Sequence, residues 1–208
     1  FELDHLYNDE DSSADYLMNF VSNHDMGRFT YYAQQALGDI SESEQLERMK
    51  LGSAFMFFAR GIPVIYYGDE QGFVGNGGDK GARENMMPSL VEEYNQIDLL
   101  GTDKTTADNN FDKSHPLYKA FSEYAEVYQA HEALRKGEQK VLKFEDEAGI
   151  FALERTLNEQ SYTIVFNSSY EVKSLSDINV QNKQTVYGQL SQHNNSSAIA
   201  PLSFVILK

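Results

Sequence analysis

The sequence contains no cysteine, which excludes disulfide bonds and any chemistry that needs a thiolate. Basic residues are also scarce, with 17 lysines and arginines against 32 aspartates and glutamates, for a formal net charge of −15. Nucleic acids and anionic membranes are normally bound through a basic surface, so both are disfavoured as partners. The acidic balance suits a neutral polyhydroxyl ligand, and it equally suits a protein that only has to stay soluble.

Long apolar runs are absent as well, and no segment approaches the ~18 residues of a membrane span. Residues 1–5 lack the basic start and apolar core of a signal peptide. The compartment stays unassigned, with a secreted or periplasmic location favoured over a cytoplasmic one. An apolar content of 41% and many Phe and Tyr residues nevertheless predict a packed globular protein.

A short apolar segment ends in three polar residues, Asn23, His24 and Asp25. Residues 17–21 are too few for a helix and predict a buried strand. A carboxylate and an imidazole at the carboxyl end of a strand stand where α/β barrels place their chemistry. The alternative is a plain turn, in which Asp25 caps the next segment and His24 is an ordinary surface histidine.

A helix followed by a second strand is predicted downstream. Residues 41–44 form a capping box, Ser-x-x-Glu, and apolar residues then recur at helical spacing. Residues 62–67 are a continuous apolar run with one proline near its start, which predicts a buried strand. Asp69 and Glu70 follow it. As strand neighbours they would point to opposite faces, which favours structural roles over a catalytic pair, with Arg83 as a candidate ion partner.

These two motifs resemble conserved regions of one enzyme family. Phe20-Val21-Ser22-Asn23-His24-Asp25 resembles the fourth conserved region of the α-amylase family, glycoside hydrolase family 13, and residues 61–70 resemble that family's eighth barrel strand. Asp79 and Arg83 stand where many members carry an Asp-x-x-x-Arg substrate-edge loop. A complete TIM (β/α)8 barrel needs about 250 residues. The resemblance, which is close over residues 14–137, therefore implies the last strands and helices of the catalytic barrel.

The resemblance also implies roles for individual residues. Asp25 is similar to the family's third carboxylate, a catalytic residue that stabilises the transition state at the cleaved sugar. His24 is similar to the imidazole that binds the same sugar, and Asn23 and Arg28 would complete the substrate-binding group. The residue at the position of Asn23 can instead brace the strand end, and in some relatives it helps to hold a chloride ion.

A retaining glycosidase needs two carboxyl groups about 5 Å apart, one nucleophile and one general acid. In the α-amylase family these come from earlier strands that are not in this chain. The resemblance thus implies that the chain alone is inactive and needs the missing N-terminal barrel portion as a partner. The substrate would be an α-glucan or maltooligosaccharide, cleaved at α-1,4 bonds with retention. No cofactor or metal is assignable from the scattered histidines, and calcium in the parent protein would be bound by upstream residues.

The pattern changes near residue 138. A helical stripe begins at Pro116 and ends at Gly137, and four period-two segments follow, which predict strands. Several short strands at close spacing predict a small antiparallel β-sandwich. We therefore predict an α/β part and an all-β part. Residues 1–137 would be the C-terminal portion of the barrel, and residues 138–208 a C-terminal β-sandwich domain. The four period-two segments predicted as strands cover residues 141–144, 150–154, 162–166 and 202–206.

Two other functions remain open from the residues. The chain could be a non-catalytic carbohydrate-binding or structural fragment, which the presence or absence of an upstream nucleophile would decide. A transglycosylase or isomerase of the same family would share every motif described above. The glycine-rich residues 72–81 do not suggest a phosphate site, because they lack the Gly-Lys-Ser/Thr ending of a P-loop.

Overall fold

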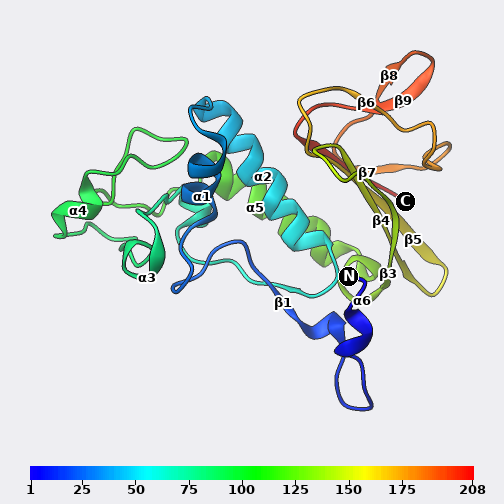
Figure 1. The fold of residues 1–208 in the computed structure, drawn as a ribbon, viewed down its shortest axis with the longest axis horizontal. Helices are drawn as coiled ribbons and strands as arrows, with labels where there is room; N and C mark the ends of the chain where they lie inside the picture. The colour runs from blue at the N-terminus through cyan, green and yellow to red at the C-terminus, as the bar shows by residue number, and fades with distance from the viewer. The chain divides into compact units, whose positions relative to one another are not determined.

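The computed structural model of the protein describes residues 1–208 (Figure 1). The chain forms two compact units. The first unit contains Phe1–Asn19, Ala54–Ile62 and Ala125–Lys208, and the second contains Phe20–Ser53 and Pro63–Tyr124. The predicted boundary between residues 137 and 138 stays a prediction. None of the helices is long and apolar enough to span a membrane.

Helices and loops make up the second unit. Its helical elements are α1 (Phe29–Leu37), α2 (Glu42–Phe58, which continues into the first unit), the 3-10 turn η3 (Asp69–Gln71), α3 (Gly78–Gly81), α4 (Glu92–Asn95) and α5 (Pro116–Ala130, which also continues into the first unit). The serine half of the predicted capping box is confirmed, because the backbone N–H of Glu44 donates to Ser41 Oγ at 3.2 Å, and the Glu44 carboxylate accepts from Arg48 Nε at 2.9 Å. Met49 of α2 packs with Leu117 and Phe121 of α5 in the core of this unit.

The two strands predicted before the polar motifs are shorter and more exposed than expected. Strand β1 (Met18–Asn19) and strand β2 (Ile62–Pro63) pair with each other. Met18 is 67% exposed and Ile62 is 46% exposed, so the predicted burial is wrong. A strand of an α/β sheet is buried by sheet neighbours on both sides and by helices on both faces. Within residues 1–208, β1 and β2 have only each other as sheet partners.

The helical stripe that begins at Pro116 is interrupted before Gly137. Helix α5 ends at Ala130, and a separate helix α6 covers Glu132–Lys136. Between them His131 has an extended backbone, with φ −121° and ψ 97°, which breaks the helical hydrogen-bond ladder. The prediction of one continuous helix is therefore wrong by this one residue. The ring of His131 lies beside Tyr162, whose hydroxyl is 3.0 Å from Nδ1.

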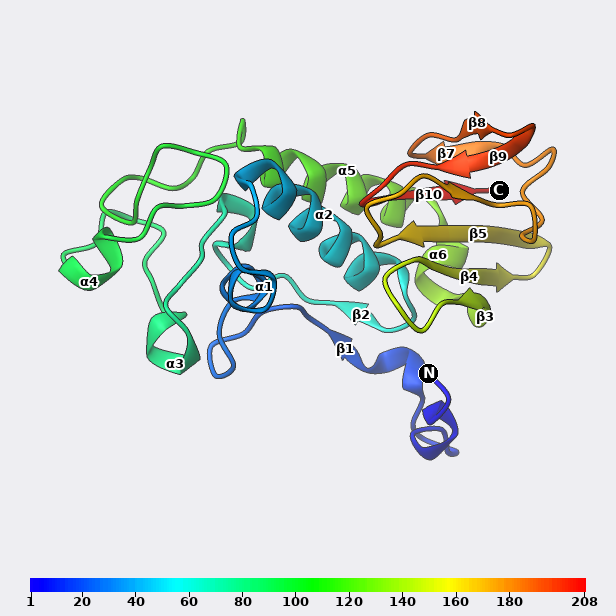
Figure 2. The same cartoon turned by 45° about the horizontal axis from the view of Figure 1, so that its top comes forward.

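The first unit contains two antiparallel sheets, and all four predicted strands are confirmed within them (Figure 2). One sheet has five strands in the order β3-β4-β5-β10-β7, and the other has three in the order β6-β9-β8. The shorter strands were not predicted. The strands are β3 (Glu138–Phe144), β4 (Ile150–Leu157), β5 (Gln160–Asn167), β6 (Lys173–Ser174), β7 (Thr185–Tyr187), β8 (Ser191–His193), β9 (Ser196–Ile199) and β10 (Ser203–Leu207).

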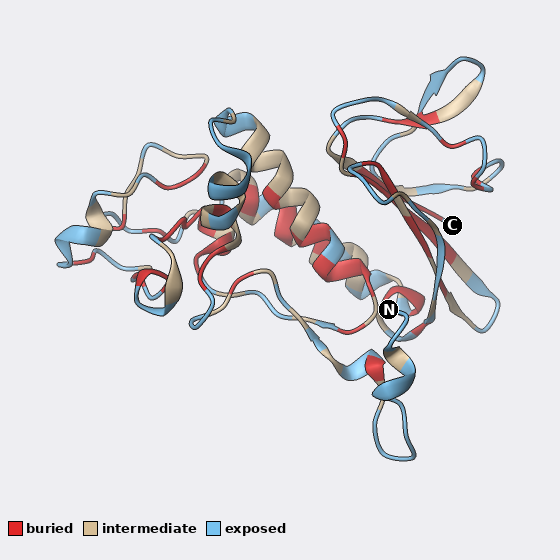
Figure 3. Ribbon diagram, in the orientation of Figure 1, coloured by how far each residue is buried: buried red, intermediate tan, exposed pale blue.

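Alternation along the central strands buries both faces of the five-stranded sheet (Figure 3). On one face, Ala152, Val165 and Val205 pack against Ile199 of β9 in the core between the two sheets. On the other face, the ring centres of Phe166 and Phe204 are 5.8 Å apart. The ring centre of Phe58, on α2, lies 5.7 Å from that of Phe204. The fold is thus a mixture of helices and antiparallel sheets, with a separate core in each unit.

Candidate functional site

The Asn-His-Asp motif forms a tight turn that is closed at its base. The backbone N–H groups of Asn23 and Gly27 each donate to the other residue's carbonyl, at 3.2 Å. The side-chain oxygen of Asn23 also accepts the backbone N–H groups of Asp25 and Met26, at 2.9 and 2.6 Å. Gly27 has φ 103°, and a Cβ there would lie 3.0 Å from the Tyr32 ring. Asn23 therefore braces the turn that presents His24 and Asp25.

Four predicted site residues meet on the surface of the second unit, and we call them the Asp25 cluster: His24, Asp25, Asp79 and Arg83. His24 Nε2 lies 3.3 Å from Asp25 Oδ2, and the two side chains are 62% and 69% exposed. Arg83 Nη2 lies 3.6 Å from both Asp25 Oδ1 and Asp79 Oδ2. Arg83 Nε also donates to the His24 carbonyl at 3.3 Å. Ion pairs this exposed contribute little to stability, so these groups stay available to a ligand.

The Asp25 cluster combines hydrogen-bond acceptors and donors. A carboxylate accepts hydrogen bonds from hydroxyl groups, whereas guanidinium and imidazole N–H groups donate to hydroxyl oxygens. Tyr32 lies beside the turn, and its hydroxyl donates to the Met26 carbonyl at 2.7 Å. The cluster can therefore bind a polyhydroxyl group from several sides. Within residues 1–208, no three His, Asp or Glu side chains are grouped so that they could hold a metal ion.

Arg28 is placed differently, because its side chain is completely buried. Nη1 donates to Asp69 Oδ1 at 2.9 Å and to the Tyr67 carbonyl at 2.8 Å. Nε donates to Glu84 Oε2 at 2.9 Å, and Nη2 donates to the Ala82 carbonyl at 3.3 Å. The guanidinium has no surface to offer a ligand, so the structure does not support direct contact of Arg28 with a substrate.

Aromatic rings complete the surroundings of Arg28. The guanidinium carbon lies 4.7 Å from the ring centre of Tyr66 and 5.0 Å from that of Phe73. The Tyr66 hydroxyl donates to the Ala82 carbonyl at 2.8 Å, and burial raises the pKa of this phenol well above its usual value. The arginine, its two carboxylates and these rings hold together chain segments that are distant in the sequence.

Asp69 and Glu70 have structural roles, as their adjacency predicts, although they lie in η3 and not in a strand. Glu70 Oε2 accepts the backbone N–H of Gly68 at 2.9 Å. Asp69 is paired with Arg28, which corrects the suggestion of Arg83 as its partner. Burial raises the pKa of Asp69 to about 6, against the opposing effects of Arg28 and of a hydrogen bond with Ser22.

Glu84 is the important residue that the sequence reasoning missed. It directly follows Arg83, and its carboxylate is buried against Arg28. The pair joins residues 56 positions apart in the sequence. One signal was present, because Glu84 is a carboxylate inside the loop that the Asp79 and Arg83 pattern had already identified. Local sequence does not show which distant cation neutralises it.

Comparison with known proteins gives this geometry a family context. The model of the α-amylase catalytic domain matches residues 4–145. The α-amylase of Streptomyces lividans is 41% identical over 168 residues, which are 80% of this chain and 18% of that protein. The chain belongs to the α-amylase family.

Two further proteins are similar to the chain, one in sequence and one in fold. The β/α-amylase of Paenibacillus polymyxa is 28% identical over 191 residues, which are 88% of this chain and 14% of that protein. The α-amylase of Geobacillus thermoleovorans, solved with acarbose, superposes with a TM-score of 0.63 over 90% of this chain and 37% of its own, at 21% identity. The chain thus spans less than a fifth of the length of the two curated relatives, and the α-amylase structure resembles it in fold.

Proposed function

We propose that this chain supplies part of the active site of an α-glucan-active glycoside hydrolase that cleaves α-1,4-glucosidic bonds with retention. Membership of the α-amylase family supports this proposal. The observation that carries it is the exposed contact of Asp25 with His24 and Arg83 at the end of the Asn-His-Asp motif. The substrate would be an α-glucan or a maltooligosaccharide.

In this proposal Asp25 is the carboxylate that stabilises the transition state. Hydrogen bonds from sugar hydroxyls to Asp25 strengthen as the ring flattens and gains oxocarbenium character, so they lower the barrier more than they tighten ground-state binding. His24, 3.3 Å away, donates to the same sugar. Arg83 contacts Asp25 and Asp79, and so orients both carboxylates at the edge of the site.

Arg28 and Glu84 act as positioning residues. The bond from Arg28 to Glu84 fixes the backbone next to Arg83, and Arg28 itself directly precedes helix α1. The backbone N–H of Phe29, the first residue of α1, donates to Ser22 Oγ at 3.1 Å, which ties the start of the helix to the motif. The buried charges thereby set the distance between Arg83 and the turn that carries Asp25.

The nucleophile and the general acid come, in this proposal, from a part of the protein outside these residues. Residues 1–137 would belong to the (β/α)8 barrel, and residues 138–208 would form the β-sandwich domain that follows it. The exposed side chains of Met18 and Ile62 support the barrel assignment, because neighbouring barrel strands would cover them. The chain alone would be inactive.

Substitution of Asp25 in the whole protein tests the catalytic role. We expect Asp25→Asn to lower kcat on a maltooligosaccharide by about two orders of magnitude or more, with a smaller change in KM and an unchanged circular dichroism spectrum. Asp39→Asn, at another exposed aspartate, is the matched control and should retain full turnover. Near-normal turnover of Asp25→Asn would refute the assignment.

Chromatography of the products separates hydrolysis from glycosyl transfer, because transfer produces chains longer than the substrate.

A further inference from the structure

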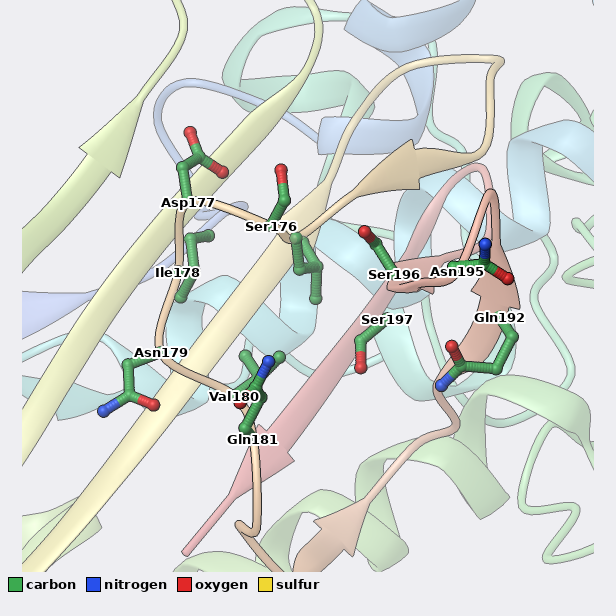
Figure 4. A pocket seen from close by; sticks show the side chains of 11 residues that line it. Ser176, Asp177, Ile178, Asn179, Val180, Gln181, Gln192, Asn195, Ser196 and Ser197 are labelled. Atoms are coloured by element: carbon green, nitrogen blue, oxygen red, sulfur yellow. The ribbon is translucent and has the colours of Figure 1, made fainter.

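A polar pocket lies in the first unit, between residues 175–181 and the β8–β9 hairpin (Figure 4). Its volume is about 530 Å³, and it contains none of the residues of the Asp25 cluster. The figure shows residues 177–181 along one side and Gln192 with Asn195 on the other, with Ser196 and Ser197 between them. A cavity of this size can accept a small number of sugar rings.

The walls of this pocket are built into the sheet. The backbone N–H of Leu175 donates to the Ser197 carbonyl at 2.8 Å, and β9 pairs with both β6 and β8. The apolar base consists of Leu175, Ile178 and Val180, which also belong to the core between the two sheets. Because these side chains are anchored in the core, the two walls keep their spacing without a ligand.

The polar lining consists almost entirely of neutral groups. Amide side chains from Gln181 and Gln192 and hydroxyls from Ser196 and Ser197 surround the apolar base. The structure gives neither glutamine side chain a hydrogen-bond partner within the chain. Asp177 is the one ionisable residue in the lining, and its carboxylate accepts a hydrogen bond from Lys143 Nζ at 2.6 Å.

We propose that this pocket binds a neutral α-glucan chain, as a binding site additional to the one proposed around Asp25. A primary amide both donates and accepts hydrogen bonds, which matches the neighbouring hydroxyls of a pyranose. With no unpaired charge in the lining, neither an anion nor a cation finds a counter-charge. The choice of an α-glucan among neutral sugars rests on the proposed function.

Affinity electrophoresis of the whole protein through gels that contain soluble starch tests the proposal. We expect the double substitution Gln181→Ala/Gln192→Ala to raise the dissociation constant for starch about tenfold, because several hydrogen bonds are lost. The same variant should hydrolyse a short chromogenic maltoside at the wild-type rate. Gln160→Ala, at an exposed glutamine outside the pocket in the same unit, is the matched control and should migrate like the wild type.

Two results separate this proposal from the catalytic one. Asp25→Asn should lower turnover by about two orders of magnitude or more yet retain the retardation in starch that depends on Gln181 and Gln192. If the double variant and Gln160→Ala are retarded equally, the pocket does not bind α-glucan and the inference is overturned. If the wild-type protein fails to hydrolyse α-glucans while the double variant still loses retardation, the catalytic proposal fails and the pocket proposal stands.

Discussion

Each unit of the molecule contains one completely buried arginine, and the two are stabilised in different ways. Arg28, in the loop-rich second unit, is neutralised by the carboxylates of Asp69 and Glu84. Arg155, on strand β4 of the first unit, donates from Nε and Nη2 to the Gly137 carbonyl at 3.2 and 2.9 Å and from Nη1 to the Phe58 carbonyl, so its acceptors are backbone carbonyls and not carboxylates. Burial accordingly lowers the pKa of Arg155.

The difference reflects what else holds each region together. Around Arg155 the sheet is already fixed by apolar residues on both faces and by strand pairing. Around Arg28 the backbone passes through turns and short helical segments rather than a sheet, so the ion pairs connect segments that no strand ladder joins. Removing the buried arginine should therefore lower the free energy of unfolding more in the second unit than in the first.

Arg28→Met tests this comparison with the largest expected effect. The substitution leaves two carboxylates buried without their cation, so we expect the free energy of unfolding to fall by about 3–5 kcal/mol, measured by urea denaturation. Arg83→Met is the matched control, since Arg83 is half exposed and its ion pairs should contribute at most ~1 kcal/mol. Equal losses for the two variants would show that the buried cluster does not hold the second unit.

Asp69→Asn sharpens the comparison through pH. The pKa of Asp69 is raised to about 6 from an unfolded value of 3.8. Between these values the unfolded chain releases the proton that the folded protein retains, so this group stabilises the fold most below about pH 4 and less as pH rises through 6. The free energy of unfolding of the wild type, minus that of Asp69→Asn, should therefore fall by on the order of 3 kcal/mol between pH 4 and 7.

Asp177→Asn provides a control of opposite sign for that titration. The ion pair with Lys143 lowers the pKa of Asp177, so its stabilising contribution is present above the unfolded pKa and is lost as the solution becomes more acidic. The corresponding wild-type-minus-variant difference should rise with pH, from acidic values up to about pH 4. A difference for Asp69→Asn that rises in the same direction would contradict the raised pKa of Asp69.

Arg155→Met should have the smallest effect of the three substitutions at buried charged residues. The variant keeps an apolar side chain of similar length but leaves the carbonyls of Gly137 and Phe58 without its donors. We expect a loss of about 1–3 kcal/mol in the free energy of unfolding. Lys140→Met, at an exposed position on β3, should change it by at most ~0.5 kcal/mol. A loss as large as that of Arg28→Met would remove the contrast between the two units.

Much of the fold could be predicted because its signals are local. Ser41 caps the first turn of α2 through the backbone N–H of Glu44, and the period-two segments form strands whose neighbours follow shortly in the chain. The prediction failed where an element depends on distant partners. Residues 62–67 have the composition of a buried strand, yet only Ile62 and Pro63 form one, because burial requires flanking strands.

The candidate site shows the same distinction between local signals and distant partners. The Asn-His-Asp turn could be identified from the sequence, because the hydrogen bonds of Asn23 to Asp25 and Met26 span two or three residues. The buried position of Arg28 could not be identified from the sequence. Nothing near it in the sequence indicates that its partners are Asp69 and Glu84, 41 and 56 positions away.

By itself the sequence determined the family, the local turn that presents Asp25 and His24, and the four main strands. The tertiary structure alone decided which charges are buried together, which polar groups face one pocket, and which apolar side chains remain exposed. The physical reason is the separation along the chain over which each interaction acts. Capping, turn formation and alternation act between residues a few positions apart, whereas desolvation and ion pairing depend on every group that the fold brings near.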